Sequence, residues 1–273
     1  MTMALAVIAG ALIGLSLGAL GGGGSILAVP VLVYLLDQSP AQATTGSLVV
    51  VGVTSLIGAM TAYRAGNVML GRGLAFGAVA IVGAVIGAAA SAAVPEPVLL
   101  AAFAALMLLV GLLMLVRQLG GRRRDSSSAG GHATSTFIIT REPRLQVHWP
   151  RAALLVGTAS AVGLLTGFLG VGGGFLVVPA LVLTLAMPMQ YAAGTSLVVI
   201  TLTSIVALAV RTGAGVAPDW GPVLVLTTVS ALAGFGGARL AARVDTRTLS
   251  AAFTGLVLGV AVYTATRALP AVF

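Results

Sequence analysis

The sequence predicts an all-α, polytopic membrane protein of about eight transmembrane helices in two homologous four-span halves, the first element of each half being broken at a Gly cluster. Three observations predict this class. Hydrophobic residues make up 59% of the 273 residues, charged residues make up only 7%, and the mean hydropathy is +1.13. A soluble domain carries about 25% charged residues, so this chain could not cover a globule with a charged surface.

The basic residues are distributed as in a membrane protein. All fourteen are Arg, and the net charge is +8. Seven of them lie between Arg117 and Arg151, whereas the long apolar runs carry none. Cytoplasmic loops beside membrane spans retain basic residues, so this pattern argues against nucleic-acid binding. The absence of cysteine excludes disulfides and thiolate metal sites.

Runs without Asp, Glu or Arg locate the spans, because a helix needs about 20 apolar residues to cross about 30 Å of hydrocarbon. The predicted elements are approximately 4–36, 45–63, 74–94, 98–118, 152–187, 192–211, 221–240 and 249–268. The first element has no basic region before it, so we expect it to act as the insertion signal and not as a removable signal peptide.

A polar segment separates two membrane units. We predict an N-terminal membrane repeat at 1–119, a polar Arg/Ser-rich cytoplasmic linker at 120–150, and a C-terminal membrane repeat at 151–273. The linker is too polar to bury and too short to form a domain, so we expect most of it to be disordered. Its two histidines, His132 and His148, have no Cys or acidic cluster near them, so we expect solvated side chains and no metal site.

An internal repeat relates the two membrane units. A shift of 149 residues (179 − 30 = 149) superimposes Pro30 on Pro179 and brings the two Gly clusters into register. Without a gap, the same shift aligns 47–50 with 196–199, 54–55 with 203–204, and 65–66 with 214–215. Apolar composition alone would not align Pro, Gly and Thr-Ser pairs in one register, so the chain is predicted to be two homologous halves.

The first element of each half is too long and too broken for one straight helix. At 1.5 Å per residue, residues 152–187 would span about 54 Å. A Gly cluster interrupts each element, at 21–24 and at 170–174, and a Pro follows. We predict either a discontinuous helix or a re-entrant hairpin, whose free N–H groups favour an anion. The alternative is close helix packing, which we expect for the ladders of Gly10, Gly14 and Gly18 and of Gly163 and Gly167.

Hydroxyls recur on the helix after each interruption. Ser47 and Thr54 share one helix face, as do Ser196 and Thr203. Such hydroxyls either bind an oxyanion or bond a carbonyl one turn back. The predicted binding residues are the following glycines and hydroxyls: Gly22, Gly23, Gly24, Ser25, Ser47, Gly172, Gly173, Gly174, Thr195 and Ser196.

The ionisable residues offer no catalytic machinery. Asp37, Glu96, Asp219 and Asp245 fall at predicted turns, and no nucleophile–base pair or carboxylate pair occurs. A phosphate loop is excluded because the chain has no Lys. We therefore expect no enzyme, no cofactor and no metal. Arg64 and Arg211 end corresponding helices. We expect both to lie at the membrane interface, and the alternative is that either draws an anion towards the pathway.

These pieces resemble the TauE/SafE family of sulfite and organosulfonate exporters. The resemblance rests on Gly18–Pro30 and Gly167–Pro179, and on the downstream Thr45-Gly46-Ser47 and Gly194-Thr195-Ser196. It implies a plasma-membrane exporter of a small anion such as sulfite or a sulfonate, working without ATP. We expect alternating access, with the anion and the lipid bilayer as partners. A passive anion channel and a non-transporting membrane subunit are the alternatives, and homo-oligomerisation is left open.

Two topologies stay open. Eight crossings with a cytoplasmic linker place both termini in the cytoplasm, with eleven Arg inside and three outside. If each Gly-broken element is a hairpin that crosses twice, the halves are inverted, with twelve Arg inside and two outside.

Overall fold

The computed structural model describes residues 2–20, 24–91, 93–121, 149–170, 172–185, 187–241, 251, 254–255, 258–264 and 266. Its helices are α1 (Thr2–Leu20), α2 (Ser25–Pro30), the π-helix η1 (Val31–Leu35), α3 (Pro40–Arg64), α4 (Leu70–Ser91), α5 (Glu96–Gly121), α6 (Trp149–Leu169), α7 (Gly174–Thr184), α8 (Met189–Gly213) and α9 (Trp220–Ala241). Residues 258–264 are also helical. No strand occurs in these described ranges, so the all-α prediction is confirmed for them.

Each predicted long element is broken, and the chain turns back at the break. The predicted element 4–36 forms α1, α2 and η1, and 152–187 forms α6 and α7. A Cβ placed on Gly24 would collide with the carbonyl oxygen of Ile13. In a continuous helix these two residues, eleven positions apart, would lie about 16 Å apart. At the second break, a Cβ on Gly173 would collide with Oγ1 of Thr166, seven positions earlier, whereas a continuous helix would separate them by about 10 Å. At both breaks the chain therefore turns back, as in the re-entrant hairpin that the sequence left open.

The two hairpins have equivalent positions in the chain. Residues 25–35 of α2 and η1 shift by 149 to 174–184, the bounds of α7, and 40–64 of α3 shift to 189–213, the bounds of α8. Both α3 and α8 end in the same turn, with Gly66 at φ 73° and Gly215 at φ 84°. Both helices begin earlier than predicted. α3 has Ser39 as its N-cap and Pro40 in its first turn, where proline is favoured, and α8 has Pro188 as its N-cap.

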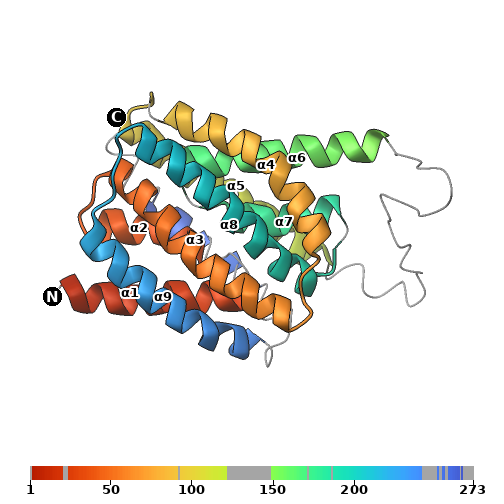
Figure 1. The fold of residues 1–273 in the computed structure, drawn as a ribbon, viewed down its shortest axis with the longest axis horizontal. Helices are drawn as coiled ribbons and strands as arrows, with labels where there is room; N and C mark the ends of the chain where they lie inside the picture. Colours follow the sequence, from red (N-terminus) through yellow and green to blue (C-terminus); the bar gives the residue numbers. More distant parts are fainter. Residues whose placement is uncertain are drawn as a thin grey trace.

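The helices pack across the two repeats. α1 packs most extensively on α9, α4 packs on α6, and α3 lies beside α8 in the middle of the molecule, running in the opposite direction (Figure 1). The shift carries α1 to α6 and α4 to α9, so the two outer pairs are equivalent. In Figure 1, α1 begins at the left and α6 begins at the right, so these equivalent helices run in opposite directions. Each outer pair therefore joins one helix that precedes residue 122 to one that follows residue 148.

Glycines allow the outer pairs to approach closely. A Cβ on Gly163 of α6 would collide with the backbone of Ala80 of α4, and a Cβ on Gly167 would collide with that of Ala84. In the other pair, Gly14 lies against the backbone of Ser230. The prediction that these glycine ladders serve helix packing is confirmed for Gly14, Gly163 and Gly167.

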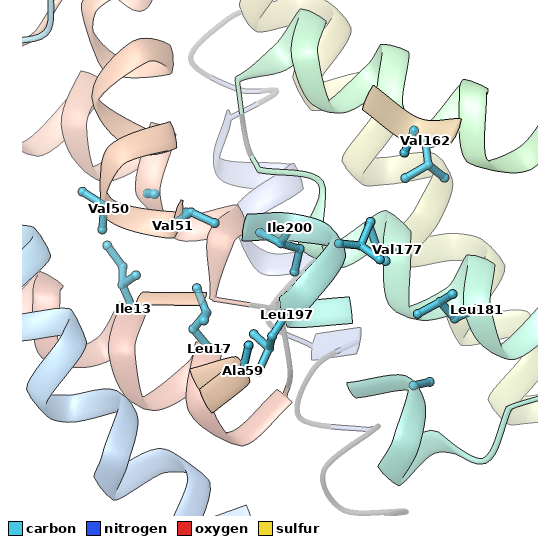
Figure 2. Packing of buried hydrophobic residues seen from close by; sticks show 14 of the residues in the cluster. Ile13, Leu17, Val50, Val51, Ala59, Val162, Val177, Leu181, Leu197 and Ile200 are labelled. Atoms are coloured by element: carbon cyan, nitrogen blue, oxygen red, sulfur yellow. The ribbon is translucent and has the colours of Figure 1, made fainter. Parts of the chain in front are cut away.

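The distribution of side chains fits a protein surrounded by lipid. Large apolar side chains point outward, among them Ile8 at 60%, Val82 at 61% and Leu232 at 73% exposure. Inside, Val51 of α3 and Ile200 of α8 lie in the middle of the apolar cluster of Figure 2. Buried hydroxyls lie between these apolar side chains, and most of them belong to α3 and α8.

Among the described residues, four helices are long and apolar enough to cross a membrane by length and composition. These are Pro40–Arg64, Leu70–Ser91, Gln190–Gly213 and Trp220–Gly237, and shorter apolar helical stretches occur at Leu5–Gly18, Ser25–Leu35, Pro97–Leu113 and Ala153–Leu169. The predicted linker residues 122–148, with His132 and His148, lie outside the described residues, as do Asp245 and much of 249–268.

Candidate functional site

The interruption between α6 and α7 packs against the central helix α3. A Cβ on Gly170 would collide with Thr44, and the hydroxyl of Ser47 donates a hydrogen bond to the carbonyl oxygen of Gly170. A Cβ on Gly172 would lie 2.5 Å from Cγ1 of Val51. Because these α3 residues follow Pro40 by four to eleven positions, the interruption lies about 6 to 17 Å into α3. It is thus well inside the helical bundle.

Three glycines of this interruption have a backbone conformation that other residues rarely adopt. Gly170, Gly172 and Gly173 each have φ 66°. Gly173 is the N-cap of α7, and its carbonyl oxygen accepts from the N–H groups of Leu176 (2.9 Å) and Val177 (2.9 Å). The first N–H groups of a helix have no partner within it, so the start of α7 presents donors and the positive end of the helix dipole.

Most hydroxyls on the central helices bond their own backbone. Thr54 donates to the carbonyl of Val50 (2.6 Å) and Thr203 to that of Val199 (3.0 Å). Thr45 donates to the carbonyl of Ala41 (2.9 Å). For these threonines, the structure shows the second of the two possibilities, a hydrogen bond to the carbonyl oxygen one turn back along the same helix.

Ser55 and Ser204 differ from these threonines. Their exposures are 0% and 1%, and neither hydroxyl has a hydrogen-bond partner. The shift of 149 residues relates them (204 − 55 = 149). A Cβ on Gly172 would lie 3.2 Å from Oγ of Ser204, so this hydroxyl faces the interruption. An unpaired buried hydroxyl is costly, which marks Ser204 as a group that a polar solute at the interruption would satisfy.

The structure brings only some of the predicted binding residues together. Ser47, Gly172, Gly173 and Gly174 meet at the second interruption. Ser47 follows the first interruption in the sequence, but its hydroxyl bonds Gly170 of the second interruption.

The remaining predicted residues lie elsewhere. Thr195 accepts from the N–H of Met69 (3.0 Å) at the start of α4, and Ser196 donates to the carbonyl of Ala193 (2.7 Å). Gly24 and Ser25 are buried at the start of α2. Gly24 has φ −66° where its counterpart Gly173 is left-handed, so the two interruptions differ. Gly22 and Gly23 lie outside the described residues.

Arg211 overturns one expectation. It was expected at the membrane interface, yet it is only 4% exposed, whereas Arg64 is exposed as expected. Its guanidinium donates to Oγ1 of Thr44 (2.9 Å) and to the carbonyl oxygens of Gly167 (3.0 Å) and Phe168 (2.9 Å). The expectation failed because these free carbonyls arise only where α6 stops at the interruption.

A small cavity lies beside the first interruption. It has a volume of about 10 Å³, close to the space that one water molecule needs. Its walls come from α1, α3 and α9, and its lining residues are Leu17, Gly18, Thr54, Ile57, Gly58, Thr61, Ala231, Gly234 and Phe235. The second interruption, in contrast, is filled by Thr44, Val51 and Thr166.

Comparisons with known proteins identify the family. The model of the family described as "Sulfite exporter TauE/SafE" matches residues 6–264. Two relatives from Xylella fastidiosa, each named "Probable membrane transporter protein", are 30% identical to this chain. The alignment covers 195 residues for strain Temecula1 and 192 for strain 9a5c, in both cases 70% of this chain and 67% of the relative.

No solved structure matches this chain. The family match nevertheless spans the apolar helices and both interruptions, which confirms the resemblance that the Gly and Pro motifs carried. The chain therefore belongs to the TauE/SafE sulfite exporter family of membrane transporters and is a multi-pass protein of the cell membrane.

Proposed function

We propose that this protein is a secondary transporter that exports a small oxyanion, sulfite or an organosulfonate, by alternating access and without catalysis. The single observation that carries the proposal is the hairpin between α6 and α7, where Ser47 and the unpaired hydroxyl of Ser204 face a glycine-rich helix start deep in the bundle. Irregular backbone within a membrane is tolerated where protein covers it or where it lines a substrate path.

The proposed binding groups are the N–H groups at the start of α7 and the hydroxyls around them. Gly172, Gly173 and Gly174 allow an oxyanion to approach the backbone, because they lack a Cβ. Ser47 and Ser204 supply hydroxyl donors without placing a full charge in lipid. Gly22, Gly23, Gly24, Ser25, Thr195 and Ser196 remain proposed contributors through the equivalent interruption.

The present conformation is closed at the second interruption. Val51 and Thr166 occupy the space that an anion would need beside Gly172 and Gly173. Binding therefore requires α3 to move relative to the α6–α7 hairpin. The cross-repeat contact between Ser47 and Gly170 is one that such a movement breaks and re-forms, which fits alternating access between two conformations.

The proposed architecture is a pair of inverted repeats, 1–119 and 151–273, joined by the cytoplasmic linker 120–150. Its support is the reversal of the chain at each interruption and the opposite directions of α1 and α6. With two crossings per hairpin, both termini lie outside and the loop with Arg239, Arg243 and Arg247 lies inside.

Reporter fusions test this architecture. We expect alkaline phosphatase fused to the C-terminus to be active, because it lies outside, and the same enzyme fused after Arg247 to be inactive. Inactivity at the C-terminus together with activity after Arg247 is the result that eight simple crossings require, and it would refute the inverted arrangement.

Transport is tested with the purified protein in liposomes. We expect saturable uptake of radiolabelled sulfite, sulfoacetate or thiosulfate, and accumulation of label in liposomes preloaded with the same unlabelled anion. Such counterflow requires a carrier. Flux that does not saturate and shows no counterflow would indicate a channel, and no flux of any anion would indicate a non-transporting subunit.

Removal of the unpaired hydroxyl of Ser204 distinguishes a role in anion binding from a role in protein stability. We expect Ser204→Ala to leave the Tm unchanged or slightly raised, because no protein hydrogen bond is lost. A hydrogen bond to a charged group contributes about 1.5–3 kcal/mol, so the KM for the transported anion should rise about tenfold. Thr203→Val is the matched control, because its hydroxyl bonds its own helix. Equal KM values in Ser204→Ala, Thr203→Val and the wild type would remove Ser204 from the site.

A further inference from the structure

Arg211 is a buried cation that only one of the two repeats possesses. It lies in the last turn of α8 and is 4% exposed. The equivalent position in the first repeat (211 − 149 = 62) holds Ala62. In Figure 1, α8 ends on the side where α1 begins, opposite to the start of α6. A feature needed only for the shared fold would be expected in both repeats, so this asymmetry calls for a separate explanation.

The hydrogen bonds of Arg211 leave donors unused. A guanidinium has five N–H donors. Nη1 donates to Oγ1 of Thr44 (2.9 Å), and Nη2 donates to the carbonyl oxygens of Gly167 (3.0 Å) and Phe168 (2.9 Å). Nε is buried and has no partner. The side chain is therefore held in place with at least one N–H free.

The charge of Arg211 is also uncompensated. Within the described part of the chain its partners are one hydroxyl and two carbonyls. The carbonyls at the end of α6 carry only the partial charge of the helix dipole, about half an elementary charge. Buried charges are otherwise paired, and arginine does not lose its proton in proteins. Among the residues that the structure describes, this buried positive charge thus has no full counter-charge.

This charge lies beside the interruption. Thr44, which accepts from Nη1, is the residue against which Gly170 packs. Phe168, which accepts from Nη2, precedes Gly170 by two positions. Arg211 is therefore connected to the glycine turn through one residue on each side, Thr44 and Phe168.

We infer that Arg211 is a substrate-binding residue whose guanidinium provides the counter-charge for the transported oxyanion and whose Nε–H donates to it. The inference rests on the proposed function and narrows its substrate class. A fixed, uncompensated positive charge favours solutes with a net negative charge. Zwitterionic sulfonates, whose ammonium group would be repelled, should be poor substrates.

The test compares charge-changing variants in the liposome assay. Arg211→Gln removes the charge and keeps an N–H donor group, and Arg64→Gln removes an exposed charge from the end of α3 as the matched control. We expect the KM for sulfite to rise about tenfold or more in Arg211→Gln and to be unchanged in Arg64→Gln. The wild type should prefer sulfoacetate to 2-aminoethanesulfonate, and Arg211→Gln should lose this preference.

A purely structural role would give a different result. If Arg211 only caps α6, Arg211→Gln lowers the Tm but keeps the KM and the preference for sulfoacetate, and the inference is overturned. If Arg211→Gln does not fold, Arg211→Lys is measured instead. The single ammonium of lysine cannot replace a guanidinium that bonds three acceptors and a ligand, so we expect the KM to rise in this variant too. An unchanged KM again overturns the inference.

Failure of the proposed function is recognised separately. In that case the wild type transports none of the anions, and the thermal shift of the detergent-solubilised protein on addition of sulfite is measured instead. A rise in Tm in the wild type and in Arg64→Gln, but not in Arg211→Gln or Arg211→Lys, supports anion binding by Arg211 without transport. No shift in the wild type, or an equal shift in all variants, rejects the inference.

Discussion

Gly173→Leu is expected to abolish transport while the protein still inserts into the membrane. Gly173 is the left-handed N-cap of α7 at φ 66°, and a Cβ there would collide with Oγ1 of Thr166. The left-handed conformation costs a residue with a Cβ about 1–2 kcal/mol, and the collision adds to this cost. The start of α7 must then shift, which removes the proposed binding groups. Counterflow of sulfite in liposomes measures the loss.

Two further variants show whether geometry causes the loss. Gly173→Ala has the same strain with less bulk, so it should retain part of the activity. Adding Thr166→Ala removes the atom with which the new Cβ collides, so the double variant should recover activity relative to Gly173→Ala. Wild-type flux in Gly173→Leu would remove the second glycine turn from the transport site.

Gly163→Leu is expected to prevent formation of a stable folded protein. Gly163 of α6 lies against the backbone of Ala80 of α4, and a Cβ would collide with its carbonyl oxygen. Overpacking costs about 1–3 kcal/mol where side chains can adjust, and more where they cannot. Here the obstacle is backbone, so the two helices must separate. We expect loss of the monodisperse peak in detergent and a Tm too low to measure.

Gly157→Leu is the matched control on the same helix. Gly157 also belongs to α6, but nothing lies within 4 Å of its Cβ position. Leucine has a higher helix propensity than glycine, by up to about 1 kcal/mol, so the Tm should be equal or higher. Equal stability of Gly163→Leu and Gly157→Leu would mean that the close α4–α6 contact does not contribute to folding.

Composition and repeat register were sufficient to predict the helical class and both interruptions. They were sufficient because clustered glycines disfavour helix independently of tertiary contacts. The prolines that follow do not mark the breaks, since Pro30 lies within α2 and Pro179 within α7. The predicted starts of α3 and α8 were less accurate, because a charge-free run gives no sign of a helix start at Ser39-Pro40 or at Pro188.

The neighbours of the interruptions could not be predicted from local pattern. Ser47 bonds Gly170, 123 positions away, because the second interruption lies against α3 of the first repeat. The burial of Arg211 has the same origin, since its acceptors belong to the end of α6. One signal was available in the sequence: Arg64 and Arg211 are two positions out of register, so they need not share an environment.

The exchange of outer helices also bears on how the chain is made. α1 ends at Leu20, and its main partner α9 begins at Trp220, 200 residues later (220 − 20 = 200). At about 5–20 residues per second, a ribosome needs roughly 10–40 s to supply that partner. During this interval the glycine-lined face of α1 is open to lipid or to insertion factors. Biogenesis, and not only the finished fold, therefore depends on keeping an early helix unpaired until a late one arrives.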